Sequence, residues 1–113
     1  MLREIKSPQR LERRLAFRVT GTGTAVIDAG GKHATLTDNG TGDYTFTFVQ
    51  PFKRVPCVTG LSPIATAGDV IMTIHSVSVT AVRVLAWDGT DGTTAKDAVF
   101  HLEVAGWDST DET

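Results

Sequence analysis

Cysteine is nearly missing from this chain of 113 residues, in which Cys57 is the only one. A lone cysteine cannot form an intramolecular disulfide, so no disulfide framework holds the fold together. Cys57 stands among apolar neighbours at residues 55–58, and we expect it to be a small buried side chain. Such usage of cysteine fits a reducing compartment or assembly inside a cell.

Long apolar runs are also missing. No stretch approaches the roughly 20 residues that are needed to cross a bilayer. The first residues are charged and lack an apolar segment, so we expect no signal peptide and no membrane partner. The chain shows no internal repeat and no long helical pattern, which argues against a repeat protein or a βαβ arrangement. Its length fits one domain with a modest core.

Residues that carry chemistry are scarce and scattered. No cysteine, histidine or aspartate lies at metal-ligand spacing from any of the three histidines, which are His33, His75 and His101. Residues 21–25 begin like a phosphate loop, but a third glycine is absent and a strand pattern follows. Residues 88–92 have the wrong spacing for a calcium loop, so a turn is expected, with a weakly bound ion as the alternative. We therefore predict no enzyme activity, no catalytic residue, no metal and no cofactor.

Short strands separated by turns dominate what is present. In the clearest strand, Tyr44, Phe46 and Phe48 alternate with threonines. Clusters rich in glycine and aspartate at residues 38–43 and 88–93 predict turns. Roughly eight such strands predict an all-β fold, an antiparallel and jelly-roll-like β-sandwich.

Charge is divided unevenly along the chain. Residues 1–18 carry six basic and two acidic side chains, a net +4, whereas residues 19–113 carry five and eleven, a net −6. Ser7 and Pro8 favour the start of a helix, and Leu11 and Leu15 would share one face of it. We predict three parts: a basic arm with a short helical or extended structure over residues 1–15, the sandwich over 16–107, and an acidic tail over 108–113.

The basic arm is the predicted docking element. A helix this short needs external support, and its positive charge suits an acidic surface of its own oligomer or of a partner. The alternative is a solvated terminus without a partner. An acidic body and a single aromatic residue near the arm argue against specific nucleic-acid binding. The residues expected to dock are Arg3, Lys6, Arg10, Leu11, Arg13, Arg14 and Leu15.

An ordered series of strand and turn residues runs from Gly42 to Gly106. Its parts are Gly42-Asp43-Tyr44-Thr45-Phe46-Thr47-Phe48, Pro51-Phe52, Val55-Pro56-Cys57-Val58, Val77-Ser78-Val79-Thr80, Val82-Arg83-Val84 and Asp97-Ala98-Val99-Phe100-His101-Leu102-Glu103-Val104-Ala105-Gly106. This series resembles small β-sandwich domains of tailed-bacteriophage virion proteins, which occur in capsid decoration (cement) proteins and at the tips of tail fibres. It spans about three-fifths of the chain, and its elements mark strands and turns.

The resemblance implies a non-enzymatic virion protein. The expected function is that of a capsid decoration protein, which binds and stabilises the outer shell as an oligomer. The implied partners are the major capsid protein and further copies of the chain, commonly as a homotrimer, on the outer capsid surface after assembly in the host cytoplasm. The alternative is a receptor- or carbohydrate-binding tip of a tail fibre or spike, with the loops at 38–43 and 88–94 as its site. A basic arm in place of a fibre shaft favours decoration.

Trp87 and Trp107 are the candidates for oligomer or partner contact, because aromatic residues often anchor interfaces. A place in the sandwich core is an equal alternative for Trp87. Trp107 follows the last expected strand, which favours the surface or an interface.

Overall fold

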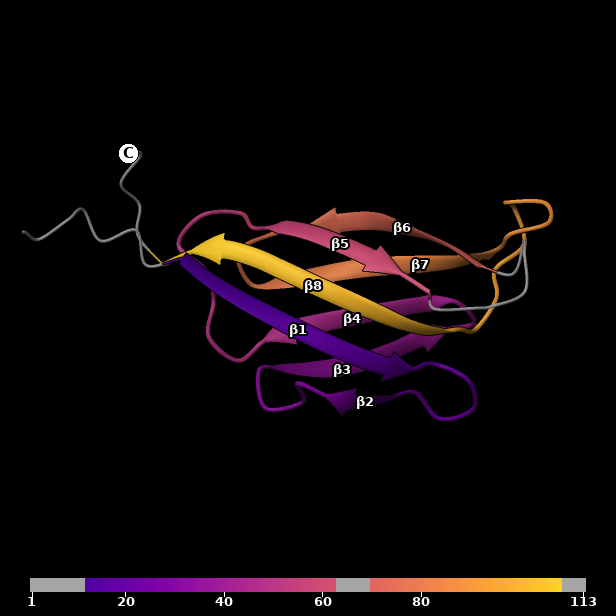
Figure 1. Ribbon diagram of the computed structural model, residues 1–113, viewed down its shortest axis with the longest axis horizontal. Helices are drawn as coiled ribbons and strands as arrows, with labels where there is room; N and C mark the ends of the chain where they lie inside the picture. The colour runs from indigo at the N-terminus through magenta and orange to yellow at the C-terminus, as the bar shows by residue number, and fades with distance from the viewer. Residues whose placement is uncertain (1–11, 63–69, 109–113) are drawn as a thin grey trace, which may run out of the picture.

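The chain forms a sandwich of two antiparallel sheets. The computed structural model describes residues 12–62 and 70–108 (Figure 1), and these residues contain eight strands and no helix. The strands are β1 (Glu12–Thr20), β2 (Val26–Ala29), β3 (Ala34–Gly40), β4 (Asp43–Phe48), β5 (Cys57–Leu61), β6 (Val70–Val77), β7 (Ala81–Asp88) and β8 (Val99–Trp107). The first sheet has the order β2-β1-β8-β5 and the second β3-β4-β7-β6. The predicted all-β sandwich is therefore confirmed.

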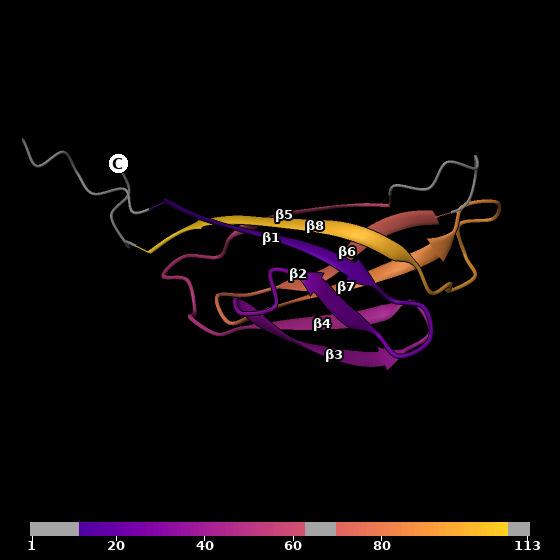
Figure 2. The same cartoon turned by 60° about the horizontal axis from the view of Figure 1, so that its bottom comes forward.

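The first and last strands pair at the centre of the first sheet. β1 and β8 run antiparallel from Glu12 opposite Trp107 to Thr20 opposite Val99. β4 and β7 pair in the same way at the centre of the second sheet, so early strands are nested with late ones in a jelly-roll-like manner. Figure 2 separates the two layers, with β1, β8 and β5 over β4 and β3.

The core lies between the sheets because the central strands alternate inward apolar side chains with outward ones. Tyr44, Phe46 and Phe48 of β4 are buried, as predicted. They meet Phe100 of β8, whose ring lies 6.1 Å from that of Phe46 at a near-perpendicular angle and 5.2 Å from that of Tyr44. Aromatic pairs at such distances add to the free energy gained by burial.

The sandwich begins at Glu12 and not at the expected residue 16. Arg13, Arg14 and Leu15 therefore belong to β1 and not to a separate arm; their backbone is extended and not helical, and the predicted boundary is corrected to Glu12. Leu15 is 2% exposed and packs in the core, because the alternation of apolar residues in β1 extends upstream to it. Nine residues of β1 pair with β8, and this pairing outweighs the weak local preference for a helix. Asp108, expected in the tail, belongs to the described residues, whereas the rest of the predicted tail and residues 1–11 of the predicted arm are not among them.

The buried hydroxyl of Tyr44 ties three segments together. Its oxygen lies 3.1 Å from the carbonyl oxygen of Gly21 and 3.1 Å from Oδ1 of Asp97, both of which are acceptors for its single proton, and it accepts from the backbone N–H of Ala98 at 3.3 Å. The same Asp97 oxygen accepts from the backbone N–H of Gly42 at 2.8 Å. This network fixes the turns at one end of the sandwich against each other.

The loop at residues 49–56 closes the other end. Phe52 is 3% exposed, and its ring is perpendicular to that of Phe48 at 5.2 Å. Gly106 of β8 lies directly against this ring, since a Cβ atom at Gly106 would stand 2.7 Å from Phe52 and 2.8 Å from Pro56. The loop can pack this closely only because position 106 has no side chain.

Cys57 is exposed, contrary to the expectation that it is buried. It stands opposite Ala105 on the outer face of the edge strand β5, whereas the next residue, Val58, packs against the core. Successive side chains of a strand point to opposite faces, so apolar neighbours in the sequence do not share a burial state.

Candidate functional site

Arg13, a predicted docking residue, is engaged within its own chain. Its Nε and Nη2 donate to the two carboxylate oxygens of Asp108 at 2.8 and 2.7 Å. Nη2 also donates to the carbonyls of Gln50 and Pro51 at 3.0 and 3.1 Å, and the guanidinium lies 4.0 Å from the centroid of the Phe52 ring. These contacts give Arg13 a structural role at the end of the sandwich where β1 begins.

The other predicted docking residues differ in their exposure. Arg14 points outward, with a side chain 61% exposed, and lies 3.5 Å from both Glu12 and Glu103. Exposed ion pairs of this length contribute little to stability, so Arg14 stays accessible to a partner. Leu15 is part of the core. Four predicted docking residues lie outside the described residues: Arg3, Lys6, Arg10 and Leu11.

The two tryptophans lie on opposite outer faces of the sandwich. Trp87 follows the buried Ala86 in β7 and turns away from the core, and its Nε1 donates to Oγ1 of Thr73 at 2.7 Å. The alternative that places Trp87 in the core is therefore wrong. Trp107 is the last residue of β8 rather than a residue beyond it, and the guanidinium of Arg54 lies 5.2 Å from its ring. The two residues do not form one contact surface.

The aspartates of the turn at residues 88–93 accept hydrogen bonds from residues of the same turn and the residue after it. Oδ1 of Asp88 accepts from the backbone N–H and the hydroxyl of Thr90 at 2.9 and 2.8 Å. The backbone hydrogen bond is the main reason that the pKa of Asp88 is lowered. Asp91 accepts in the same way from Thr93 and Thr94. These contacts fit the predicted turns at 88–93, in which aspartates bond to the backbone two or three residues later.

Charged groups on the outer face of the second sheet are also paired. The Nε and Nη2 atoms of Arg83 donate to the carboxylate of Asp43 at 2.8 and 2.6 Å, and this contact holds the pKa of Asp43 below its usual range. Asn39 donates to Asp43 at 3.2 Å and to Thr45 at 2.7 Å. The described residues include no group of three or more histidine, cysteine, aspartate or glutamate side chains that could hold a metal ion. They also include no helix long and apolar enough to span a membrane.

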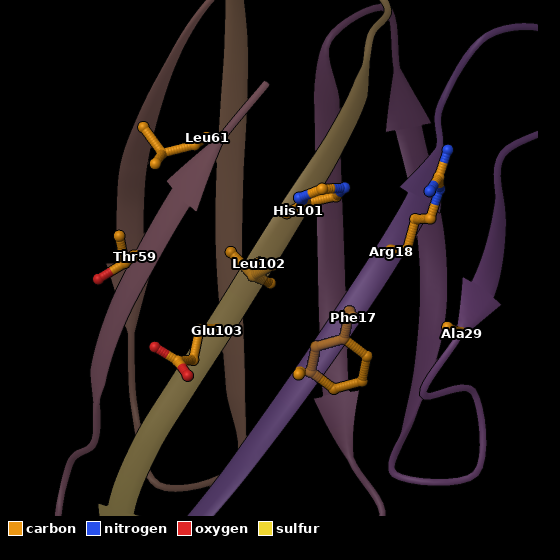
Figure 3. Close-up of a pocket in the computed structure, with 9 residues that line it drawn as sticks. Phe17, Arg18, Ala29, Thr59, Leu61, His101, Leu102 and Glu103 are labelled. Carbon is orange, nitrogen blue, oxygen red and sulfur yellow. The ribbon is translucent and has the colours of Figure 1, made fainter. Parts of the chain in front are cut away.

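The outer face of the first sheet carries an open groove of about 410 Å³. The strand register places Ala29, Arg18, His101 and Leu61 in one row across the four strands. Figure 3 shows side chains of this row together with Glu103 and Thr59 of the neighbouring row. That row contains Ala16, Glu103 and Thr59. The groove is hollow because side chains such as Ala16, Ala29 and Thr59 are short.

No window of the sequence indicates this groove. Its lining residues come from four strands that become neighbours only when the sheet assembles. Each small residue taken alone is an ordinary outward position of a strand.

Comparisons with known protein families, with curated proteins and with solved structures gave no match for this chain.

Proposed function

We propose that this chain is a non-enzymatic capsid decoration protein of a tailed-bacteriophage virion. It binds the major capsid protein on the outer surface of the shell as an oligomer and stabilises the shell, after assembly in the host cytoplasm. It has no specific nucleic-acid partner and no membrane partner. The all-β sandwich provides the scaffold, and the segment before Glu12 provides the contact with the capsid.

The observation that carries this proposal is the anchoring of β1 at Arg13. Residues 1–11 carry Arg3, Lys6 and Arg10 against one acidic side chain, Glu4, a net charge of 3 − 1 = +2. The remaining 102 residues, 113 − 11, carry eight basic and twelve acidic side chains, a net −4. The contacts of Arg13 fix the point at which this cationic segment joins the sandwich. A positively charged segment that joins the sandwich at a fixed position is suited to docking onto an acidic surface.

The contacts within the turns give no support to the alternative of a carbohydrate-binding tip. Asp88 and Asp91 are already hydrogen-bonded inside their own turn. A sugar would have to compete with these intramolecular bonds for the same oxygens, which makes binding there weaker.

The test measures binding of the full chain to capsids assembled from the major capsid protein that is encoded with it. We expect saturable co-sedimentation that weakens as salt is raised, because the contact is electrostatic. The variant with Arg3→Glu, Lys6→Glu and Arg10→Glu should bind at least about tenfold more weakly. Lys32→Glu, a change of an exposed lysine in the β2–β3 loop, is the matched control and should bind normally.

A deletion variant must end at residue 11. Removing residues 1–15 would also delete Arg13 and the buried Leu15, so a loss of binding could reflect unfolding of β1. The chain lacking residues 1–11 should keep a cooperative unfolding transition and lose capsid binding. Full occupancy of capsids by this variant, or no binding by the intact chain, would overturn the proposal.

A further inference from the structure

The groove on the first sheet continues onto an unprotected edge. Leu61, at one side of the groove, is 68% exposed and belongs to β5, which is the edge strand of that sheet. β5 carries no charged side chain, and its outer edge has no strand neighbour in the described part of the chain. Edge strands usually carry charges or prolines that prevent pairing with another chain. An apolar residue this exposed on such an edge is typical of a surface that another chain covers.

Two opposite charges lie on the same face. Arg18 of β1 is exposed and makes no ion pair with any residue that the structure describes. Glu103 of β8 has one ion pair there, at 3.5 Å to Arg14, in which both side chains are more than half exposed. The charged ends of Arg18 and Glu103 point away from each other (Figure 3). Each charge therefore remains available to a group from outside the chain.

We propose that this face binds the same face of another copy of the chain, with Arg18 of each copy against Glu103 of its neighbour. In a two-fold symmetric dimer, residue i of each copy meets residue j of the other. A face that carries the available cation of Arg18, the available anion of Glu103 and an apolar rim at Leu61 is complementary to itself in such an arrangement. Leu61 and the short side chains of the groove are then covered. The inference names the oligomer contact of the proposed decoration protein and in that sense rests on the proposed function.

Sedimentation velocity of the full chain, without capsids, tests the apolar part of the contact. The chain should sediment as a dimer in the micromolar range, because a face that binds its own copy closes after two chains. Leu61→Asp should weaken self-association at least about tenfold, because it places a charge in a covered apolar contact. Val49→Asp is the matched control, since Val49 is also 68% exposed but lies in the loop after β4, away from the groove. It should leave the sedimentation unchanged.

A charge-swap cycle tests the polar part. Arg18→Glu and Glu103→Arg should each weaken self-association by about tenfold, and the double variant should restore it. Circular dichroism and a thermal unfolding scan of each variant show whether the monomer is still folded. A full chain that stays monomeric at about 0.5 mM overturns the inference, as does an oligomer that survives Leu61→Asp or a double variant without recovery.

The capsid-binding measurement separates this inference from the proposed function. A monomeric chain that still decorates capsids refutes the self-association face alone. An oligomer that depends on Leu61 but binds no capsid refutes the decoration function and leaves the face in place.

Discussion

Arg13 and Asp108 form a bidentate ion pair that joins the start of β1 to the residue after β8. The two nitrogen–oxygen distances are 2.8 and 2.7 Å, and the side chains are only 20% and 21% exposed. The guanidinium also covers the ring of Phe52 and bonds to the backbone of the loop at 49–56. One side chain thus holds together three segments that are far apart in the sequence.

Arg13→Ala should lower the free energy of unfolding by about 2 kcal/mol, because it removes the ion pair, two hydrogen bonds to carbonyls and the contact with Phe52. Urea denaturation at neutral pH measures this. Arg14→Ala is the matched control, since Arg14 is exposed and its ion pairs are long. It should change stability by less than about 0.5 kcal/mol. Equal losses in the two variants would contradict the role given to Arg13.

Stability should fall in acid in part through the two aspartates that are paired with arginines. The pKa of Asp108 and that of Asp43 lie below the ordinary 3.8 because Arg13 and Arg83 donate hydrogen bonds to them. A carboxyl whose pKa is lower in the folded state stabilises the fold above its unfolded pKa, and this contribution is lost as pH falls through the folded pKa. We therefore expect the urea midpoint to be level at neutral pH and to drop below about pH 4.

Asp108→Asn should flatten part of this acid slope, and Arg13→Met should flatten it as well, since either change removes the pair. The comparison is made by urea denaturation at a series of pH values. An acid slope in Asp108→Asn as steep as that of the unchanged chain would show that the Arg13 pair does not cause it.

Tyr44 should resist ionisation as long as the chain is folded. Burial is the largest cause that raises its pKa, and hydrogen bonding to Asp97 adds to it. A phenol whose pKa is raised in the folded state stabilises the fold below its unfolded pKa, about 10, and this contribution is lost as pH rises through the folded value. Tyr44 is the only tyrosine, so tyrosinate absorbance reports on it alone. The absorbance should rise together with unfolding of the backbone, measured by circular dichroism; a rise that precedes unfolding would contradict this.

Tyr44→Phe should cost about 1–2 kcal/mol, because the N–H of Ala98 and the carboxylate of Asp97 lose a buried partner. Thermal unfolding measures the loss. Phe is nearly the same size, so an unchanged stability would mean that water or relaxation replaces the hydroxyl.

Gly106→Ala should destabilise the sandwich by about 2 kcal/mol, because the new methyl group would collide with Phe52 and Pro56. Gly31→Ala is the control, since a Cβ at Gly31 would meet only Ile27, at 3.8 Å. It should be neutral or slightly stabilising, because alanine restricts the unfolded chain more than glycine does. Chemical denaturation of both variants measures the difference.

The strands of the sandwich could be predicted where one period dominates a short window. Tyr44, Phe46 and Phe48 alternate without interruption, and their burial is confirmed. The start of β1 could not be predicted in this way, because the spacing of Leu11 and Leu15 fits a helix while that of Leu15 and Phe17 fits a strand. Pairing with β8, which lies more than eighty residues away, decides between the two.

The roles of single side chains depended still more on distant partners. Arg13 appeared as a docking cation because its partners, Asp108 and the carbonyls of the loop at 49–56, lie far away in the sequence. Trp87 could not be assigned to a face because the pairing of β7 with β6 and β4 decides which side points inward. The groove could not be predicted because its lining depends on the register of four paired strands.

The pairing of β1 with β8 has a consequence for biosynthesis. β1 occupies a central place in its sheet, yet its partner on one side is the last strand of the sandwich to be translated. On the ribosome, Leu15, Phe17 and Val19 stay without this partner until β8 has left the exit tunnel. Contacts between residues so distant in sequence also slow folding. The sheet can therefore close only after translation of the domain, and the nascent chain must avoid aggregation until then.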